Sequence, residues 1–222
     1  MITAERKPLD EIIAMISPYK KLLVVGCGSC VAECAAGGEK ETGLLASALR
    51  MDARMTNKEL ETREMTLERQ CVYEFIDQLT GLTDGYDAVL SLACGAGVQA
   101  VAEVFPNIPI LPALNTLFLG QTKEAGLWLE NCRGCGQCRL HLFADVCPVT
   151  RCAKQIFNGP CGGSQAGQCE VDPETPCAWD LIITRLEERG QLNLLEEVYE
   201  PADWSKRQGK GFRKIAREDQ QV

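Results

Sequence analysis

The sequence predicts an α/β protein with an N-terminal parallel-sheet, Rossmann-like domain and a cysteine-rich C-terminal domain that ends in a helix. Short apolar strands alternate with amphipathic helices over residues 1–120, which is the pattern of a parallel α/β sheet. Beyond that point, eight of the thirteen cysteines fall within fewer than fifty residues, and regular periodicity is lost until residue 178. We therefore expect an α/β domain over 1–120, a ferredoxin-like domain over 121–200, and a basic tail over 201–222.

The first helix is predicted by apolar residues at i, i+3, i+4 and i+7, namely Leu9, Ile12, Ile13 and Ile16. It should stop before Pro18, which cannot continue a helix. Residues 21–25 form a short apolar strand, and helices are expected from about residue 31 and over residues 41–51.

The later elements of this domain alternate in the same way. A weak strand at 64–68 precedes a helix at 71–79, and a clear strand at 87–92 precedes a helix at 98–105. A last strand is expected over 108–111, although its flanking prolines weaken it.

Cysteines and glycines gather where the two clear strands end, in Gly26-Cys27-Gly28-Ser29-Cys30 and in Ala93-Cys94-Gly95-Ala96-Gly97. Ligands of open α/β sheets collect beyond the carboxyl ends of the strands, and glycines permit close backbone approach and N–H donation to a bound group. We expect cofactor contacts from Gly26, Gly28, Gly95 and Gly97. We expect a third cluster held by four of five cysteines, which are Cys27, Cys30, Cys34, Cys71 and Cys94.

Two other interpretations of these strand ends stay open. Buried cysteine is common as a small apolar side chain, so the thiols can belong to the core. A dinucleotide site is weakly indicated, because the third glycine and the downstream acid of that fingerprint are missing.

The C-terminal cysteines show the ligand pattern of four-iron clusters. Three lie at two-residue intervals and a Cys-Pro follows, as in bacterial ferredoxins, where the cysteine before proline serves the other cluster. We expect two [4Fe–4S] clusters, with the fourth ligand of the triple coming from beyond Cys147. The eight candidate ligands are Cys132, Cys135, Cys138, Cys147, Cys152, Cys161, Cys169 and Cys177.

Disulfides and zinc are the alternatives. The charged N-terminus lacks an apolar signal core, so we expect a cytoplasmic, reducing location in which disulfides are rare. Structural zinc also uses Cys-x2-Cys pairs and stays an alternative at one site. His141, the single histidine, is expected to donate a hydrogen bond rather than to bind metal.

The composition excludes some classes of binding partner. No apolar run approaches the roughly 20 residues of a membrane span, and the net charge of −8 argues against nucleic acid. The basic tail is expected to be solvated or to dock on an acidic partner, and its cations are Lys206, Arg207, Lys210, Arg213, Lys214 and Arg217. No paired acid and base or activated nucleophile is evident, so a relay that feeds electrons to a flavin elsewhere is favoured over a complete enzyme.

Four C-terminal segments and one N-terminal segment resemble a known family. They are Asn131-Cys132-Arg133-Gly134-Cys135-Gly136-Gln137-Cys138, Asn158-Gly159-Pro160-Cys161-Gly162-Gly163, Gly167-Gln168-Cys169-Glu170-Val171, Cys177-Ala178-Trp179, and Gly26-Cys27-Gly28-Ser29-Cys30 with Cys34 and Gly37-Gly38. Together they resemble the small iron-sulfur subunit of the two-subunit methylenetetrahydrofolate reductase of acetogenic and related bacteria.

The resemblance implies an electron-transfer subunit that delivers electrons to the flavin of a catalytic methylenetetrahydrofolate reductase subunit, within one-carbon metabolism. It also implies a donor such as ferredoxin or an NADH-linked subunit. The competing class is a structural zinc subunit of the same reductase without a redox role. A corrinoid-linked accessory is disfavoured, because the chain has one histidine and no Asp-x-His-x-x-Gly run.

Overall fold

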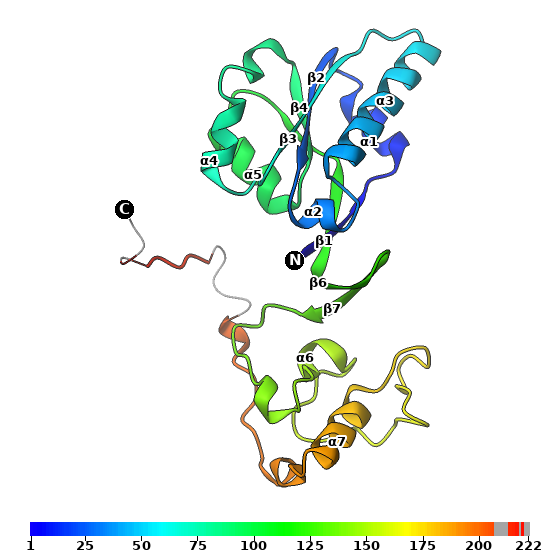
Figure 1. Cartoon of the computed structure of the whole chain (residues 1–222), viewed down its shortest axis with the longest axis vertical. Helices are drawn as coiled ribbons and strands as arrows, with labels where there is room; N and C mark the ends of the chain where they lie inside the picture. The colour runs from blue at the N-terminus through cyan, green and yellow to red at the C-terminus, as the bar shows by residue number, and fades with distance from the viewer. Residues whose placement is uncertain (207–212, 218, 220–222) are drawn as a thin grey trace. The chain divides into compact units, whose positions relative to one another are not determined.

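The computed structural model describes residues 1–206, 213–217 and 219, and the chain forms two compact units, Met1–Leu129 and Glu130–Val222 (Figure 1). The mixed α/β class is confirmed. Two of the tail cations, Arg207 and Lys210, lie outside the described residues. No helix within the described part of the chain is both long and apolar enough to cross a membrane.

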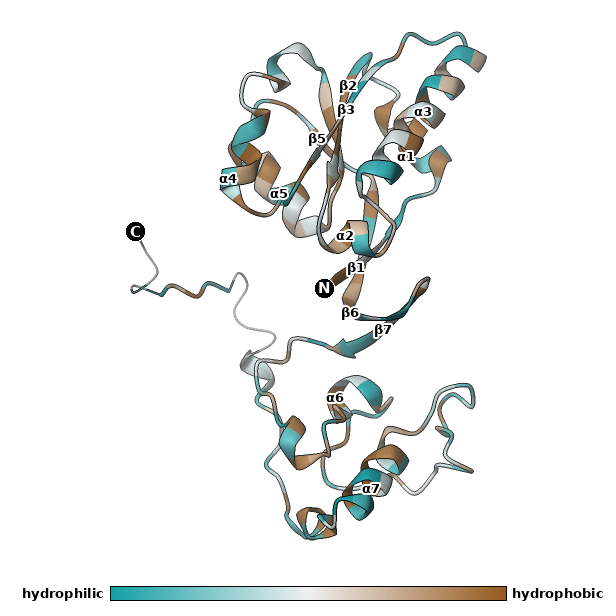
Figure 2. Ribbon diagram, in the orientation of Figure 1, coloured by the Kyte–Doolittle hydropathy of each residue, from teal (hydrophilic) through white to brown (hydrophobic). Residues whose placement is uncertain are grey.

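The first unit is built on a four-stranded parallel sheet with strand order β3-β2-β4-β5. The strands are β2 (Lys21–Cys27), β3 (Glu61–Leu67), β4 (Ala88–Leu92) and β5 (Ile110–Pro112). Strands β2 and β4 are buried almost throughout, because helices cover both faces of a parallel sheet. The predicted alternation of strand and helix is therefore confirmed, and the apolar strands stand out in Figure 2.

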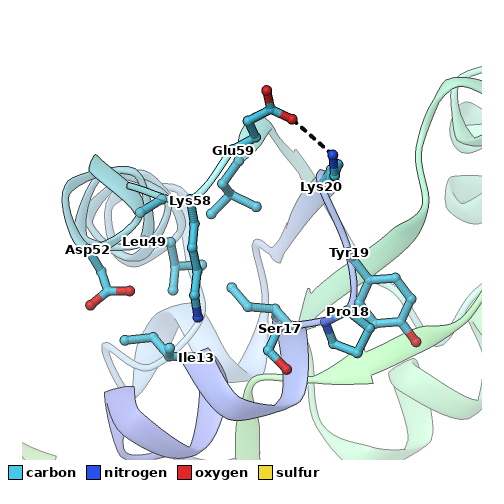
Figure 3. A pocket seen from close by; sticks show the side chains of 12 residues that line it. Ile13, Ser17, Pro18, Tyr19, Lys20, Leu49, Asp52, Lys58 and Glu59 are labelled. Atoms are coloured by element: carbon cyan, nitrogen blue, oxygen red, sulfur yellow. Dashed lines mark hydrogen bonds and ion pairs between the residues drawn. The ribbon is translucent and has the colours of Figure 1, made fainter. Parts of the chain in front are cut away.

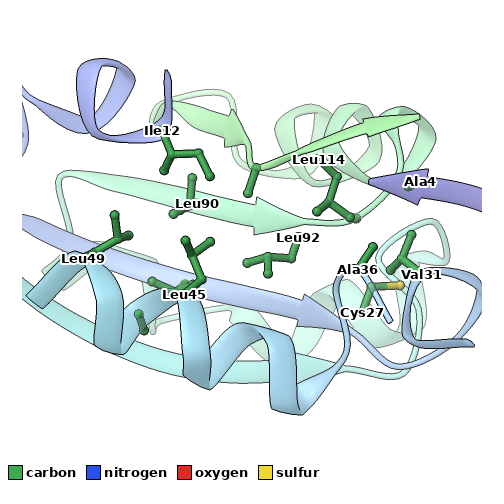
Figure 4. Packing of buried hydrophobic residues seen from close by; sticks show 14 of the residues in the cluster. Ala4, Ile12, Cys27, Val31, Ala36, Leu45, Leu49, Leu90, Leu92 and Leu114 are labelled. Carbon is green, nitrogen blue, oxygen red and sulfur yellow. The ribbon is translucent and has the colours of Figure 1, made fainter. Parts of the chain in front are cut away.

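Helices cover both faces of this sheet. α1 (Leu9–Ile16) and α3 (Glu39–Met55) lie on one face, and α4 (Tyr73–Ile76) and α5 (Gly95–Val104) lie on the other (Figure 1). The short α2 (Cys30–Glu33) follows β2 at the carboxyl edge. Figure 4 shows how α3 packs on the sheet through Leu45 and Leu49, which meet the β4 leucines Leu90 and Leu92.

A second, antiparallel sheet was not predicted. Its order is β1-β6-β7, formed by β1 (Ile2–Arg6), β6 (Leu114–Glu124) and β7 (Leu127–Cys132). The β6–β7 turn contains Gly126 at φ +86°, a backbone conformation that glycine adopts without a steric penalty. Six of the eleven β6 residues are polar, so its apolar signal is too weak to mark a strand from sequence alone.

The second unit has little regular structure. Among its described residues, the helices are α6 (Pro148–Arg151) and α7 (Ala178–Glu188). Short 3-10 turns lie before α6, at Leu140–Leu142, and after α7, at Leu192–Glu196 and Trp204–Lys206. The predicted terminal helix is confirmed, with its apolar stripe buried and a glycine at φ +64° just beyond its end.

The small core of this unit is aromatic. The Phe143 ring centroid lies 5.8 Å from that of Trp179, 5.9 Å from that of Phe157 and 5.5 Å from that of Tyr199. Trp179 Nε1 donates to the Ile156 carbonyl at 3.1 Å, so the one polar atom of the indole is satisfied in this core.

Candidate metal centres

Two hollows in the second unit are each lined by four cysteines. Cys132, Cys135, Cys138 and Cys147 line the first, and Cys152, Cys161, Cys169 and Cys177 line the second. All thirteen thiols of the chain are free. The eight C-terminal cysteines thus divide into two quartets that are consecutive in sequence, which we call the first and the second pocket.

The first pocket encloses about 230 Å³. The backbone N–H of Gly134 donates to Cys132 Sγ at 3.4 Å, and Thr150 Oγ1 donates to Cys147 Sγ at 3.6 Å. Gly134 and Gly136 have φ of +61° and +79°, so the loop through the cysteine triple needs glycine at both positions. Thiolate sulfurs that accept such donors are typical of iron-sulfur sites, where N–H···S contacts tune the cluster.

The second pocket has a smaller volume, about 20 Å³. Two backbone bonds close the loop that carries its last two cysteines, from Cys169 N–H to the Thr175 carbonyl at 2.9 Å and from Cys177 N–H to the Gly167 carbonyl at 2.7 Å. Gly163 N–H donates to Cys161 Sγ at 3.5 Å, which repeats the Cys-x-Gly contact of the first pocket.

A charged pair lies beside the second pocket. Cys161 Sγ donates to Glu170 Oε1 at 3.4 Å, and the Lys154 ammonium pairs with the same carboxylate. The hydrogen bond from Lys154 is the largest cause that lowers the pKa of Glu170, so this carboxylate stays charged next to the thiol.

Helix α6 separates the two pockets. Cys147 is its N-cap residue and lines the first pocket, whereas Cys152 follows its last residue and lines the second. This grouping differs from the expectation that the triple takes its fourth thiolate from beyond Cys147. Ala144 and Asp145 have positive φ, and these two residues reverse the chain so that Cys147 returns to the triple.

The side chains are gathered without reaching an ion-binding arrangement. Over the residues that the structure describes, no group of three or more His, Cys, Asp or Glu side chains is arranged so that it could hold a metal ion. His141 is exposed in the Leu140–Leu142 turn and lines neither pocket. The chemistry of the donor set, four thiols in each pocket, is nevertheless that of an iron-sulfur or zinc site.

The cysteines of the first unit occupy the carboxyl edge of the parallel sheet. Cys27 is the last residue of β2, Cys94 caps α5 directly after β4, and Cys71 follows β3 by four residues. Burial is the largest cause that raises the pKa of Cys27, and the nearby side chains of Cys71 and Cys94 act in the same direction. The edge therefore brings cysteines from three loops together.

The expected glycines at this edge have contacts within the chain. A Cβ on Gly26 would lie 2.3 Å from Thr42 Oγ1, and one on Gly97 would lie 2.8 Å from Ala93 Cβ. Gly28 N–H donates to the Leu67 carbonyl at 2.8 Å, and Gly95 N–H donates to Thr116 Oγ1 at 2.8 Å. These contacts account for the four glycines by packing, and their contact with a cofactor stays a prediction.

Sequence reasoning missed a hollow of about 360 Å³ beneath α1 and α3 (Figure 3). It lies at the amino end of β2, away from the cysteines, and Lys20 and Glu59 pair at its rim at 2.9 Å. Its lining mixes apolar helix residues with scattered charges, a pattern without a distinctive sequence signal.

The chain thus contains an α/β unit and two pockets lined by four cysteines each, and one comparison with known proteins matches its C-terminal part. Residues 111–205 match the family described as methylene-tetrahydrofolate reductase C terminal. The matched segment contains both pockets. The match supports a methylenetetrahydrofolate reductase-related C-terminal domain in this chain.

Other comparisons add little. No curated protein matches the chain. A solved extracellular ligand-binding receptor from Verminephrobacter eiseniae ef01-2 matches 47% of this chain at 16% identity and a TM-score of 0.31. The chain spans 28% of the length of that receptor, and a likeness at this score carries no argument.

Proposed function

We propose that this chain is the iron-sulfur electron-transfer subunit of a methylenetetrahydrofolate reductase, with one [4Fe–4S] cluster in each pocket. The observation that carries the proposal is the pair of four-cysteine pockets within the segment that matches the reductase family. When bound, such clusters accept and donate single electrons, which is chemistry that the side chains alone do not supply.

The residues of the chain would hold and tune these groups. Four thiolates supply each pocket, and the N–H groups of Gly134 and Gly163 donate to a ligand sulfur in each. Donation to a ligand sulfur offsets part of its negative charge, which favours the reduced state. The Phe143 core fixes the spacing of the pockets, because Phe157 lines the first, Trp179 lines the second and Phe143 contacts both.

The remaining chemistry belongs to partners. A flavin in a separate catalytic subunit would take two electrons, one at a time, together with a proton. It would pass them as a hydride to methylenetetrahydrofolate, which takes a second proton from solvent to give methyltetrahydrofolate. The electrons would come from a one-electron donor such as ferredoxin or from an NADH-linked subunit. A cytoplasmic location fits free thiols, because disulfides are rare in reducing compartments.

The test is flavin reduction in the reconstituted pair. The chain, loaded and reduced anaerobically, should reduce the flavin of the catalytic subunit in the complex, and a Cys135→Ala variant should do so much more slowly. The isolated chain with methylenetetrahydrofolate and a strong reductant should give no sustained methyltetrahydrofolate. Sustained product from the isolated chain, or equal flavin reduction by the variant, would contradict a relay role.

A further inference from the structure

Three loops converge at the carboxyl edge of the parallel sheet. Strand β2 lies between β3 and β4, with Cys27 paired to Leu67 of β3 and Gly26 paired to Leu92 of β4. Because parallel strands end at the same edge, the loop after β3 and the loop after β4 flank the end of β2. Cysteines follow all three strands at this edge.

Gln70 fixes the loop that carries Cys71. Its side chain is fully buried, and Nε2 donates to the Val25 carbonyl at 2.9 Å and to the Gly26 carbonyl at 3.0 Å. Ser91 Oγ of β4 donates to Gln70 Oε1 at 2.6 Å. One amide thereby joins the ends of β2 and β4, and the residue that follows it, Cys71, is held beside both.

The loop that carries Cys30 is tied to the same place. Gly28 N–H donates to the Leu67 carbonyl, Ser29 Oγ donates to the Glu68 carbonyl at 2.9 Å, and Arg69 Nε donates to Ser29 Oγ at 3.3 Å. Cys30 starts α2 immediately after these contacts. It therefore lies at the edge where the loop after β3 carries Cys71.

The sulfur of Cys27 contacts the loop after β3, because Cys27 Sγ donates to the Glu68 carbonyl at 4.0 Å. The residue is 9% exposed and ends β2, so it lies between the loops that carry Cys71 and Cys94. Cysteines from both flanking loops can therefore join this sulfur as ligands of one centre.

Exposure separates these thiols from ordinary core cysteines. Cys71 is exposed, and Cys30 and Cys94 are half-buried, so they are not simply apolar filling. Cys34 differs. It is 6% exposed, and its thiol donates to the Ala4 carbonyl at 3.5 Å and to the Val31 carbonyl at 3.6 Å. Its sulfur lies against two carbonyl oxygens in the core, so Cys34 is placed as a hydrogen-bond donor rather than as a ligand.

We propose that Cys27, Cys71 and Cys94, with Cys30 as the fourth thiolate, hold a third [4Fe–4S] centre in the first unit, and that Cys34 is not a ligand. The iron-sulfur identity of this centre rests on the function proposed for the chain, whereas the ligand set rests on the edge geometry. One of its ligands, Cys71, faces solvent, so the centre is open to an external electron donor.

The test compares the full-length chain with Cys71→Ser, Cys94→Ser and Cys30→Ser variants, and uses Cys34→Ser as the matched control. Iron, sulfide and zinc are measured after anaerobic purification, with circular dichroism to confirm folding. Each of the first three variants should lose about four irons, the content of one cubane, and Cys34→Ser should lose none. A Cys34→Ser variant that loses iron while Cys30→Ser keeps it would overturn the ligand set.

Alkylation of the cysteines in the native chain, followed by mass spectrometry, tests the site without a substitution and so does not depend on the folding of a variant. In the native chain, Cys71 should resist alkylation despite its exposure and become reactive once a chelator removes the metal. Rapid alkylation of Cys71 in the loaded chain would overturn the site. If the chain holds about eight irons that Cys71→Ser leaves unchanged, this third centre is wrong and the two-cluster function stands. A chain without iron refutes both.

Discussion

Cys147 and Cys152 flank the single helical turn of α6, and yet they line different pockets. At a rise of 1.5 Å per residue, a helical path of five steps from Cys147 to Cys152 advances about 7.5 Å along the helix axis. Two centres bound through these cysteines would lie close together, and the short turn would hold their spacing constant. Close, fixed spacing is what sequential one-electron transfer requires.

This spacing predicts magnetic interaction between the centres. Electron paramagnetic resonance of the fully reduced chain should show broadened or split signals in the wild type. Cys135→Ala, which removes the partner centre, should restore a simple spectrum from the remaining cluster of the second unit. A wild-type spectrum that equals the sum of independent centres would mean that α6 does not hold two clusters side by side.

The grouping of Cys147 with the triple predicts how iron losses combine. Cys135→Ala and Cys147→Ser should each remove about four irons, and the double variant should lose no more than either single change. Cys135→Ala combined with Cys161→Ser should lose about eight. Iron analysis distinguishes this grouping from the bacterial-ferredoxin pattern, in which Cys147→Ser and Cys135→Ala would deplete different clusters and their losses would add.

The aromatic core predicts a stability effect confined to the second unit. Phe143→Ala removes a buried ring that contacts three other rings, and should cost about 3–5 kcal/mol in the free energy of unfolding. Phe143→Leu, the matched control, should cost less because it leaves a smaller cavity. Urea unfolding followed by circular dichroism measures both, and equal costs for the two variants would contradict the packing argument.

The contacts of Asp87 predict that the stability of the first unit depends on pH. Its carboxylate accepts the backbone N–H groups of Lys20 and Lys21, both at 2.8 Å, and these bonds lower its pKa in the folded state. A lowered folded pKa gives stability that is present above the unfolded pKa of about 3.9 and is lost as the pH falls through the folded value.

Asp87→Asn should therefore be less stable than the wild type near neutral pH. The difference should shrink at the most acidic pH at which the first unit remains folded. Thermal unfolding at both pH values checks this expectation, and a difference that stayed constant with pH would exclude the carboxylate charge as its source.

Sequence periodicity was sufficient for the elements that bury apolar stripes. Ile12 and Ile16 marked α1, the apolar run of β2 marked the central strand, and Ile182 and Leu186 marked α7. The antiparallel sheet was missed, because β1 has five residues and its long-range pairing to β6 has no local signal.

The sequence was sufficient to find the candidate cysteine ligands, but not to show which of them line the same pocket. The spacing of Cys132, Cys135 and Cys138 identified a ligand loop, whereas the return of Cys147 depends on positive φ at Ala144 and Asp145. Neither alanine nor aspartate is a residue type that by itself predicts this reversal of the chain. Gln70 was also missed, since only the folded edge shows that one amide joins two strands.

The measurement that tests the central claim most directly is the metal content of the anaerobically purified full-length chain, with electron paramagnetic resonance after reduction. Two pockets in the second unit and the sheet-edge site predict about twelve irons with matching sulfide, and reduced-cluster signals. Removing both pockets through Cys135→Ala and Cys161→Ser should leave about four. Zinc in place of iron, without sulfide or a paramagnetic signal, would contradict the account and leave a structural subunit.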